Sequence, residues 1–219
     1  MATLAQAQEQ TEVIQGFIAL AQEMATEYFQ TLGGASAAVV REAFKAYLPV
    51  LLEYFGEWVS SSTLDYYALL RAEHTDLKYY DLSTLDLIGA PEEERIDKTS
   101  RWAVDPIAQE DLMDEEALER FHQAIDEYLQ EVEGETFKEA LERDPDDALF
   151  MRLLEPGADH CKLCIIAASR GAVYLSEETA GGLEDWHVKC KCEIIPVWEK
   201  SDIPPDYDYE AVKQMYKDL

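Results

Sequence analysis

The chain has 219 residues, of which 47% are hydrophobic and 11% aromatic, so it holds enough apolar material for a core and is not disordered as a whole. Its 46 acidic residues outnumber 18 basic ones, which gives a formal net charge of −28 at pH 7. Because nucleic-acid affinity comes mainly from Lys and Arg, this balance argues against a direct grip on DNA or RNA. Such a charge is typical either of a solvated surface or of a protein that stays beside packed nucleic acid or basic partners without sticking.

The N-terminal segment shows no targeting signal. The sequence MATLAQAQEQTEV lacks the basic start and the apolar centre of a signal peptide. No apolar run approaches the roughly 18 residues of a membrane span. We therefore expect a protein made and kept in the cytoplasm, where thiols stay reduced, with no membrane partner.

Helical periodicity dominates the N-terminal half. Apolar residues at steps of three and four predict a helix over 4–32, ended by Gly33 and Gly34. Ser36 is a candidate cap for a second helix, which Pro49 is expected to kink or break. After Gly56 a further helix is expected over about 57–73. Its Leu64, Tyr67 and Leu70 are interpreted as core positions rather than a docking face.

The middle of the chain gives mixed signals. Residues 74–110 contain Gly, Pro and a run of Glu, which predicts an extended connector with Trp102 anchored on the helical core. Periodicity returns over about 114–132, and after Gly134 a shorter helix is expected over 135–143, so the two would form a hairpin. His122 lies near the apolar stripe and receives no functional role.

Residues 149–154 are interpreted as a strand or a short entry segment, and one final helix is expected in the Tyr-rich tail. The predicted fold is mainly α, with an elongated helical N-terminal part and a small α+β zinc-stabilised C-terminal module. The predicted domains are a helical region with its connector at 1–110, a helical hairpin at 111–147, a zinc-binding module at 148–198 and a tail at 199–219.

All four cysteines fall in one short segment. The pattern is Cys161-Lys-Leu-Cys164, then 22 residues, then His187-Val-Lys-Cys190-Lys-Cys192. A Cys-x-x-Cys turn places two thiolates on one ion, and the return segment supplies imidazole and further thiolates. Thiolate and imidazole ligands favour zinc over magnesium or calcium.

Five candidates compete for the four positions of a tetrahedral ion. The preferred set is Cys161, Cys164, His187 and either Cys190 or Cys192. Because 190 and 192 share one parity of a strand and 187 does not, His187 needs a turn before the strand, which Gly181-Gly182 and Trp186 make possible. An all-cysteine site is the second choice, and His160 is a weaker sixth candidate.

Three rival interpretations compete with a closed structural zinc site. A redox Cys-x-x-Cys leaves the second pair unexplained, and structural disulfides conflict with a reducing compartment. A catalytic zinc needs an open position and a nearby base, and nothing marks Glu184 or Glu193 as that base. Structural zinc fits best, since about 45 residues bury too little apolar surface to fold alone and zinc supplies on the order of 10 kcal/mol. The expected mini-core comprises Phe150, Val173, Tyr174, Ile194, Ile195, Val197 and Trp198.

The same residues resemble a known family. Cys161-x-x-Cys164, the stretch Ala168-Ser169-Arg170-Gly171-Ala172-Val173-Tyr174, His187-x-x-Cys190-x-Cys192 and Ile195-Pro196-Val197 resemble the C-terminal module of MuF-like phage minor head proteins. These are named for bacteriophage Mu, and the likeness is closest to forms from actinobacterial phages. Tyr47-Leu48-Pro49, Tyr54-Phe55-Gly56, Tyr67-x-x-Leu70-Arg71 and Arg101-Trp102-Ala103 follow that family's order. The resemblance covers most of residues 40–198.

The resemblance implies a virion component in the phage head, present in few copies at the portal vertex or the capsid interior. Its implied partners are the portal protein and the major capsid or scaffold protein, and it is implied to be oligomeric in the virion. Some relatives carry an added protease or toxin domain, for which 219 residues leave no room, so no catalytic residue is assigned and the protein is not expected to be an enzyme. For Arg170 and Gly171 the plain expectation is a tight turn in which the arginine bonds nearby carbonyls.

Two other functions stay open at this point. A zinc-containing module that binds packaged or ejected DNA is the main alternative, although residues 155–198 hold four basic residues against seven acidic ones. A metal-dependent hydrolase is weaker, because neither His-Glu-x-x-His nor Gly-x-Ser-x-Gly occurs.

Overall fold

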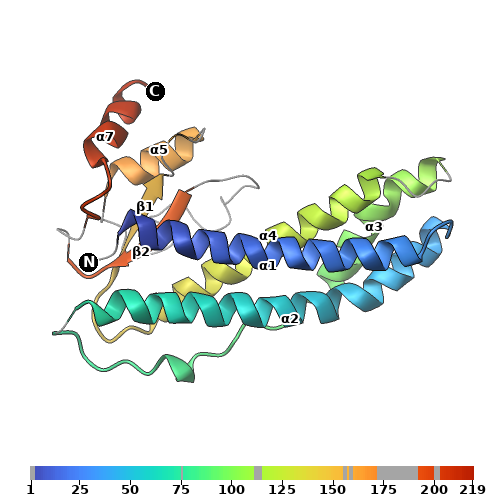
Figure 1. Ribbon diagram of the computed structural model, residues 1–219, viewed down its shortest axis with the longest axis horizontal. Coiled ribbons are helices and arrows are strands. Elements are labelled where there is room, and N and C mark those ends of the chain that lie inside the picture. Colours follow the sequence, from blue (N-terminus) through green and yellow to red (C-terminus); the bar gives the residue numbers. More distant parts are fainter. Residues whose placement is uncertain are drawn as a thin grey trace. The chain divides into compact units, whose positions relative to one another are not determined.

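The computed structural model describes residues 3–74, 76–110, 115–154, 157, 160–171, 192–199 and 203–219. The structure is 71% helical with one small two-stranded sheet, which confirms the predicted mainly α class. None of the described helices combines the length and the apolar content that crossing a bilayer requires. Figure 1 shows the order of the elements along the chain.

The first helix confirms the sequence prediction. Helix α1 runs over Leu4–Thr31, and Gly34 follows it with φ of 77°, a left-handed conformation that glycine adopts without strain. Its first turn is capped from far along the chain, because the Asp206 carboxylate accepts hydrogen bonds from the amides of Leu4 and Ala5 at 2.9 and 3.3 Å. The start of α1 therefore depends on the C-terminal tail.

The predicted division of the second helix is wrong. Helix α2 is continuous over Ala37–Ala72, with Pro49 and Gly56 inside it, and the amide of Val40 bonds the carbonyl of Ser36 as expected at a helix start. Pro49 removes one helical hydrogen bond, at a cost of about 3 kcal/mol. The buried stripe on either side of it continues without interruption and offsets that cost; it comprises Val40, Phe44, Leu48, Leu51, Leu52, Phe55 and Val59.

The predicted connector is wrong over its second half. Helix α3 covers Glu93–Glu110, preceded by the 3₁₀ turn η1 at Leu82–Thr84. Its low hydrophobicity hid it, because only a narrow stripe around Ile96, Ala103 and Val104 is buried. Trp102 is 42% exposed rather than anchored in the core, and the guanidinium of Arg120 stacks over its ring.

The predicted hairpin is also wrong. Helix α4 is one helix over Glu115–Glu142, and Gly134 lies inside it. A glycine in a helix costs only about 1 kcal/mol relative to alanine. The apolar stripe continues on both sides of Gly134 with the buried Val132, Phe137 and Leu141, so packing outweighs the low helix preference of glycine.

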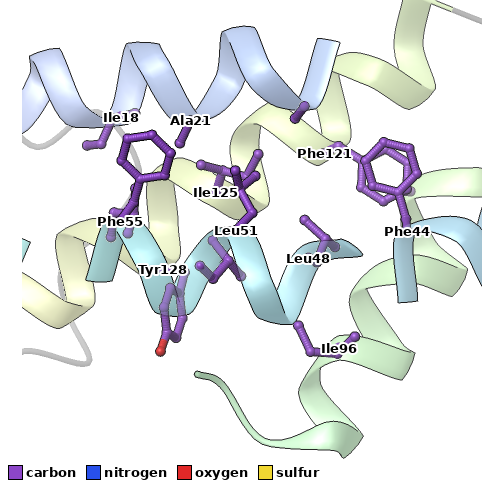
Figure 2. Packing of buried hydrophobic residues seen from close by; sticks show 14 of the residues in the cluster. Ile18, Ala21, Phe44, Leu48, Leu51, Phe55, Ile96, Phe121, Ile125 and Tyr128 are labelled. Carbon is purple, nitrogen blue, oxygen red and sulfur yellow. The ribbon is translucent and has the colours of Figure 1, made fainter. Parts of the chain in front are cut away.

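The chain divides into two compact units. Unit 1 consists of Met1–Val13, Ser62–Asp86 and Gly134–Leu219, and unit 2 of Ile14–Ser61 and Leu87–Glu133. Unit 2 has an aromatic core in which the rings of Phe44 and Phe121 stack with centroids 3.7 Å apart (Figure 2). A Cβ at Gly56 would lie 3.5 Å from the carbonyl oxygen of Ile88, an ordinary van der Waals contact, so the helix packs closely against this segment at Gly56.

Unit 1 contains the sheet and the shorter helices. Strand β1, Leu149–Leu154, confirms the expected strand and pairs antiparallel with β2, Cys192–Val197. Helix α5 spans Lys162–Ser169, and α7, Tyr209–Lys217, confirms the expected helix in the tail. The core of this unit holds the buried Met151, Leu153, Ile195 and Val197.

The predicted mini-core is described in part. Ile195 and Val197 are buried, and Trp198 is partly buried against the same cluster, as expected. Val173 and Tyr174, and the side chains of Phe150 and Ile194, lie outside the described residues.

Candidate metal centre

Two of the predicted ligands meet at the start of α5. Cys161 is the N-cap of this helix, and its sulfur accepts a hydrogen bond from the amide of Cys164 at 3.3 Å. The Cys-x-x-Cys spacing turns the second thiol back toward the first, so the two sulfurs lie 3.3 Å apart. Cys164 is buried and Cys161 partly so.

This geometry suits a zinc knuckle. Two thiolates, each about 2.3 Å from a tetrahedral zinc ion, are about 3.8 Å apart, so a small outward rotation of the two sulfurs would admit an ion. The amides at a helix N-terminus stabilise negative charge, which favours the thiolate form that binds metal. The donor set is therefore suited to zinc, and these two residues would supply half of its ligands.

The return segment is described only at its end. His187 and Cys190 lie outside the described residues, and so does the side chain of Cys192. The backbone of Cys192 begins β2 and pairs with Leu154 at the end of β1. Across the described ranges, no group of three or more His, Cys, Asp or Glu side chains is arranged to hold a metal ion.

The topology nevertheless brings the two ligand-bearing segments into one unit. Helix α5 packs against β1, and β1 pairs with the strand that starts at Cys192. His160, the weaker candidate, directly precedes Cys161 and is partly buried. The full ligand set stays a prediction.

The other end of α5 is held by α7. The hydroxyl of Tyr209 donates a hydrogen bond to the carbonyl of Ser169 at 2.8 Å. Gly171 follows with φ of 69°, which confirms the expected tight turn, and a Cβ there would lie 2.8 Å from the Tyr209 hydroxyl oxygen. Both the conformation and the close approach require glycine, so the turn fixes where the chain leaves the knuckle helix.

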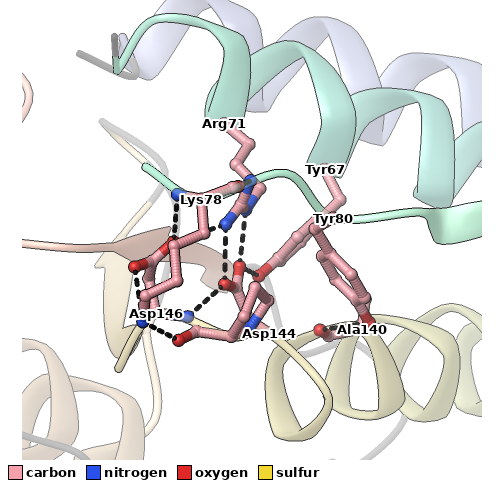
Figure 3. Close-up of polar contacts among 8 residues, drawn as sticks. Tyr67, Arg71, Lys78, Tyr80, Ala140, Asp144 and Asp146 are labelled. Carbon is pink, nitrogen blue, oxygen red and sulfur yellow. Dashed lines mark hydrogen bonds and ion pairs between the residues drawn. The ribbon is translucent and has the colours of Figure 1, made fainter. Parts of the chain in front are cut away.

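A second polar cluster of unit 1 was not recognised in the sequence. Arg71, in the last turn of α2, forms a two-point ion pair with Asp144 just after α4, with Nε–Oδ2 and Nη2–Oδ1 distances of 2.8 and 2.9 Å (Figure 3). Arg71 also bonds Asp146 at 2.7 Å and the carbonyl of Lys78 at 2.6 Å. The hydroxyl of Tyr67 donates to Asp144 at 2.5 Å.

The protonation states follow from burial and these bonds. Burial alone would raise the pKa of Asp144, but hydrogen bonds from Arg71, Tyr67 and the amide of Asp146 outweigh it and lower that pKa below its usual value. Burial, and then the bond to Asp144, raise the pKa of Tyr67, so its hydroxyl keeps its proton. The cluster is a fixed carboxylate–guanidinium pair with a phenol donor.

This cluster holds segments together rather than offering a reactive group. Asp144 has a fully buried side chain, and every named partner donates to a carboxylate or accepts from the guanidinium. The available signal was the position of Arg71, four residues after Tyr67 on the buried side of α2. An arginine at the edge of an apolar stripe indicates a buried carboxylate partner.

Comparisons with known proteins give one match. No curated protein and no solved structure matches the chain. The VG15 protein family, a viral family that includes phage proteins, matches residues 1–219. That match is coarser than the resemblance to MuF-like minor head proteins of actinobacterial phages, which stays a prediction. Because the match covers the whole length, the chain belongs to the VG15 protein family.

Proposed function

We propose that the chain is a structural minor head protein of a tailed phage, located at the portal vertex or the capsid interior. The observation that carries this proposal is the match of all 219 residues to a viral protein family. The mainly helical fold is compatible with a structural role, and the described Arg71–Asp144 pair joins two segments of the chain. Its partners would be the portal protein and the major capsid or scaffold protein.

The charge supports a place beside packaged DNA. A net charge of −28 repels the phosphate backbone, so the protein would occupy the head interior without binding the genome. In this role it acts as a spacer or adaptor and not as an enzyme. We further propose that a structural zinc ion, bound by Cys161, Cys164, His187 and one of Cys190 and Cys192, stabilises the segment after β1.

Mass spectrometry of purified particles tests the location. We expect the chain in full heads at a few copies per particle, far below the major capsid protein. Cross-linking in intact particles should join it to portal or capsid subunits. Its absence from purified particles, or cross-links to tail proteins alone, would overturn the proposed location.

Metal analysis tests the zinc site separately. We expect one equivalent of zinc per chain, lost together with thermal stability after chelation. The variant Cys161→Ser should bind zinc at least about tenfold more weakly, and Ser169→Ala, at the other end of α5, should keep the metal. A metal-free protein that is insensitive to chelator would refute the zinc site and leave the head location untouched.

A further inference from the structure

Helices α1 and α2 of unit 2 expose a second apolar stripe. Each helix buries one stripe in the core and carries another about 100° further round its axis, at steps of three and four residues. On α1 the second stripe is Phe17, Leu20, Met24 and Tyr28, and on α2 it is Tyr47, Val50, Tyr54 and Trp58. We name these eight residues the α1–α2 seam.

Ring contacts show that the two stripes face each other. At one end Phe17 meets Trp58 edge to face, with centroids 5.5 Å apart. At the other end Tyr28 stacks on Tyr47 at 4.1 Å. The two helices run side by side in opposite directions (Figure 1). The spacing of three and four residues therefore keeps the intervening residues of both stripes between these two ring contacts.

The seam is unusually exposed for apolar side chains. Leu20, Met24, Val50, Tyr54 and Trp58 are between 43% and 64% exposed. Scattered exposed apolar residues are normal, but here five of them, with three half-buried aromatic rings, form one continuous surface. Tyr and Trp are also the residues that most often anchor protein interfaces.

Charge around the seam identifies its occupant. The two stripes share a pattern, with Glu23 and Glu27 on α1 and Glu53 and Glu57 on α2 each directly before a seam residue, and all four carboxylates are exposed. Helix α1 contains no Lys or Arg, and neither do residues 46–70 of α2. The apolar line therefore has an acidic border without any Lys or Arg in these stretches to neutralise it, and Arg41 and Lys45, earlier on α2, pair with Asp97.

We propose that the α1–α2 seam binds a basic amphipathic helix of a partner protein, whose apolar face covers the seam while its Lys and Arg meet the four glutamates. A helix laid along two others buries its apolar face at steps of three and four, which matches the spacing on both sides of the seam. A second copy of this chain is disfavoured, because it brings the same acidic border and a net charge of −28. The proposal rests on the proposed function only in placing the partner among the structural proteins of the phage.

A designed peptide tests the surface without knowing the partner. The probe is a fluorescent helix of about 18 residues, made of Leu and Lys, with all Leu on one face. The reference peptide has the same composition but spreads its Leu around the axis. Anisotropy at about 0.15 M salt should show the one-faced peptide binding the full chain at least about tenfold more tightly, because only it presents an apolar face.

Matched variants locate the binding. Leu20→Ser with Val50→Ser should weaken binding of the one-faced peptide about tenfold. The control pair, Leu87→Ser with Met215→Ser, lies at exposed apolar positions outside the seam and should weaken it less than about twofold. Glu53→Gln with Glu57→Gln should weaken binding of the one-faced peptide about threefold. Asp86→Asn with Glu92→Gln removes the same two charges outside the seam and should weaken it less. Circular dichroism checks that each variant keeps its helix content, and the glutamine pair provides a test that leaves the apolar surface intact.

Three outcomes would overturn the proposal. One is equal binding of both peptides, which would mean that charge alone acts. Another is unchanged binding to the Leu20→Ser, Val50→Ser variant. The third is a wild-type dimer in solution that becomes a monomer in the Leu20→Ser, Val50→Ser variant, which would identify a second copy as the occupant of the seam. Because particle composition tests the head location independently, a failed peptide experiment with the chain present in heads would remove the seam proposal alone.

Discussion

Unit 2 and unit 1 are stabilised in different ways. Unit 2 is built from helices whose buried stripes come from residues three and four apart, and its core is aromatic and aliphatic. Unit 1 joins short elements through specific polar contacts between distant residues, such as Arg71 with Asp144 and Leu4 with Asp206. Local periodicity therefore predicts the helices of unit 2 but gives no information on the polar contacts between distant residues of unit 1.

The largest effect is expected from the core of unit 2. Phe121→Ala removes a ring with 0% exposure that stacks on Phe44, and should lower the free energy of unfolding by about 3–5 kcal/mol. Urea denaturation measures this loss. Tyr79→Ala, at an 87% exposed position, is the control and should change it by less than about 0.5 kcal/mol. A small loss for Phe121→Ala would mean that aromatic packing does not stabilise unit 2.

The next effect tests the polar cluster of unit 1. Asp144→Ala leaves the Arg71 guanidinium without its main carboxylate in a buried place, and should cost about 3 kcal/mol. Lys78→Ala is the control, because it removes an exposed ammonium that pairs with Asp146 and bonds the carbonyl of Pro145, and it should cost less than about 1 kcal/mol. Equal losses for both variants, measured in the same urea titration, would contradict the central role of the buried pair.

A smaller effect is expected at the turn after α5. Gly171→Ala places a side chain at φ of 69° and against the Tyr209 hydroxyl, so it should cost about 1–2 kcal/mol. In a Tyr209→Phe background the closest contact, with the hydroxyl oxygen, is gone, while the ring carbon Cζ stays 3.2 Å from the new Cβ and the backbone strain remains, so the substitution should cost less. The difference between the two thermal unfolding measurements isolates the close approach. An identical cost in both backgrounds would show that the contact with α7 does not constrain this turn.

The smallest effect concerns pH in unit 2. Asp97 binds Arg41, Lys45 and Arg101, and hydrogen bonds from Lys45 and then Arg41 lower its pKa from 3.8 to about 2. A carboxylate with a lowered folded pKa contributes stability that is complete above its unfolded pKa and is lost as the pH falls through the folded one. The stability difference between wild type and Asp97→Asn should therefore be constant above about pH 5 and shrink toward about pH 2.

Chemical denaturation at several pH values measures that difference. Asp86→Asn, an exposed carboxylate, is the control. If the difference between wild type and Asp97→Asn stays constant over the acid range, the three cations do not stabilise the charged form of Asp97.

The sequence predicted the helices wherever a strong apolar stripe lay between clear end signals, as for α1. The predicted helix ends at Pro49, Gly56 and Gly134 were wrong, because the local preference of proline and glycine does not include the packing of the buried stripe that continues past them. Helix α3 was missed because its buried stripe is narrow and its surface strongly charged. In each case tertiary contacts decided the outcome.

For the candidate site, spacing alone was informative. Cys161 and Cys164 are brought together, as a Cys-x-x-Cys turn requires. The Arg71 and Asp144 pair could not be found in this way, because the two residues are 73 positions apart and each has an ordinary local explanation. Arg71 ends a helix, and Asp144 precedes a proline.

The contacts of residues 203–219 have a consequence for folding during synthesis. Asp206 caps the start of α1, and the hydroxyl oxygen of Tyr207 accepts a hydrogen bond from the amide of Leu154 in β1 at 3.0 Å. Every residue of unit 2 has left the ribosome once position 133 emerges. Unit 1 cannot form all its contacts until residues 203–219 have also emerged. We expect unit 2 to fold on the nascent chain first, with unit 1 completed only after residues 203–219 have emerged.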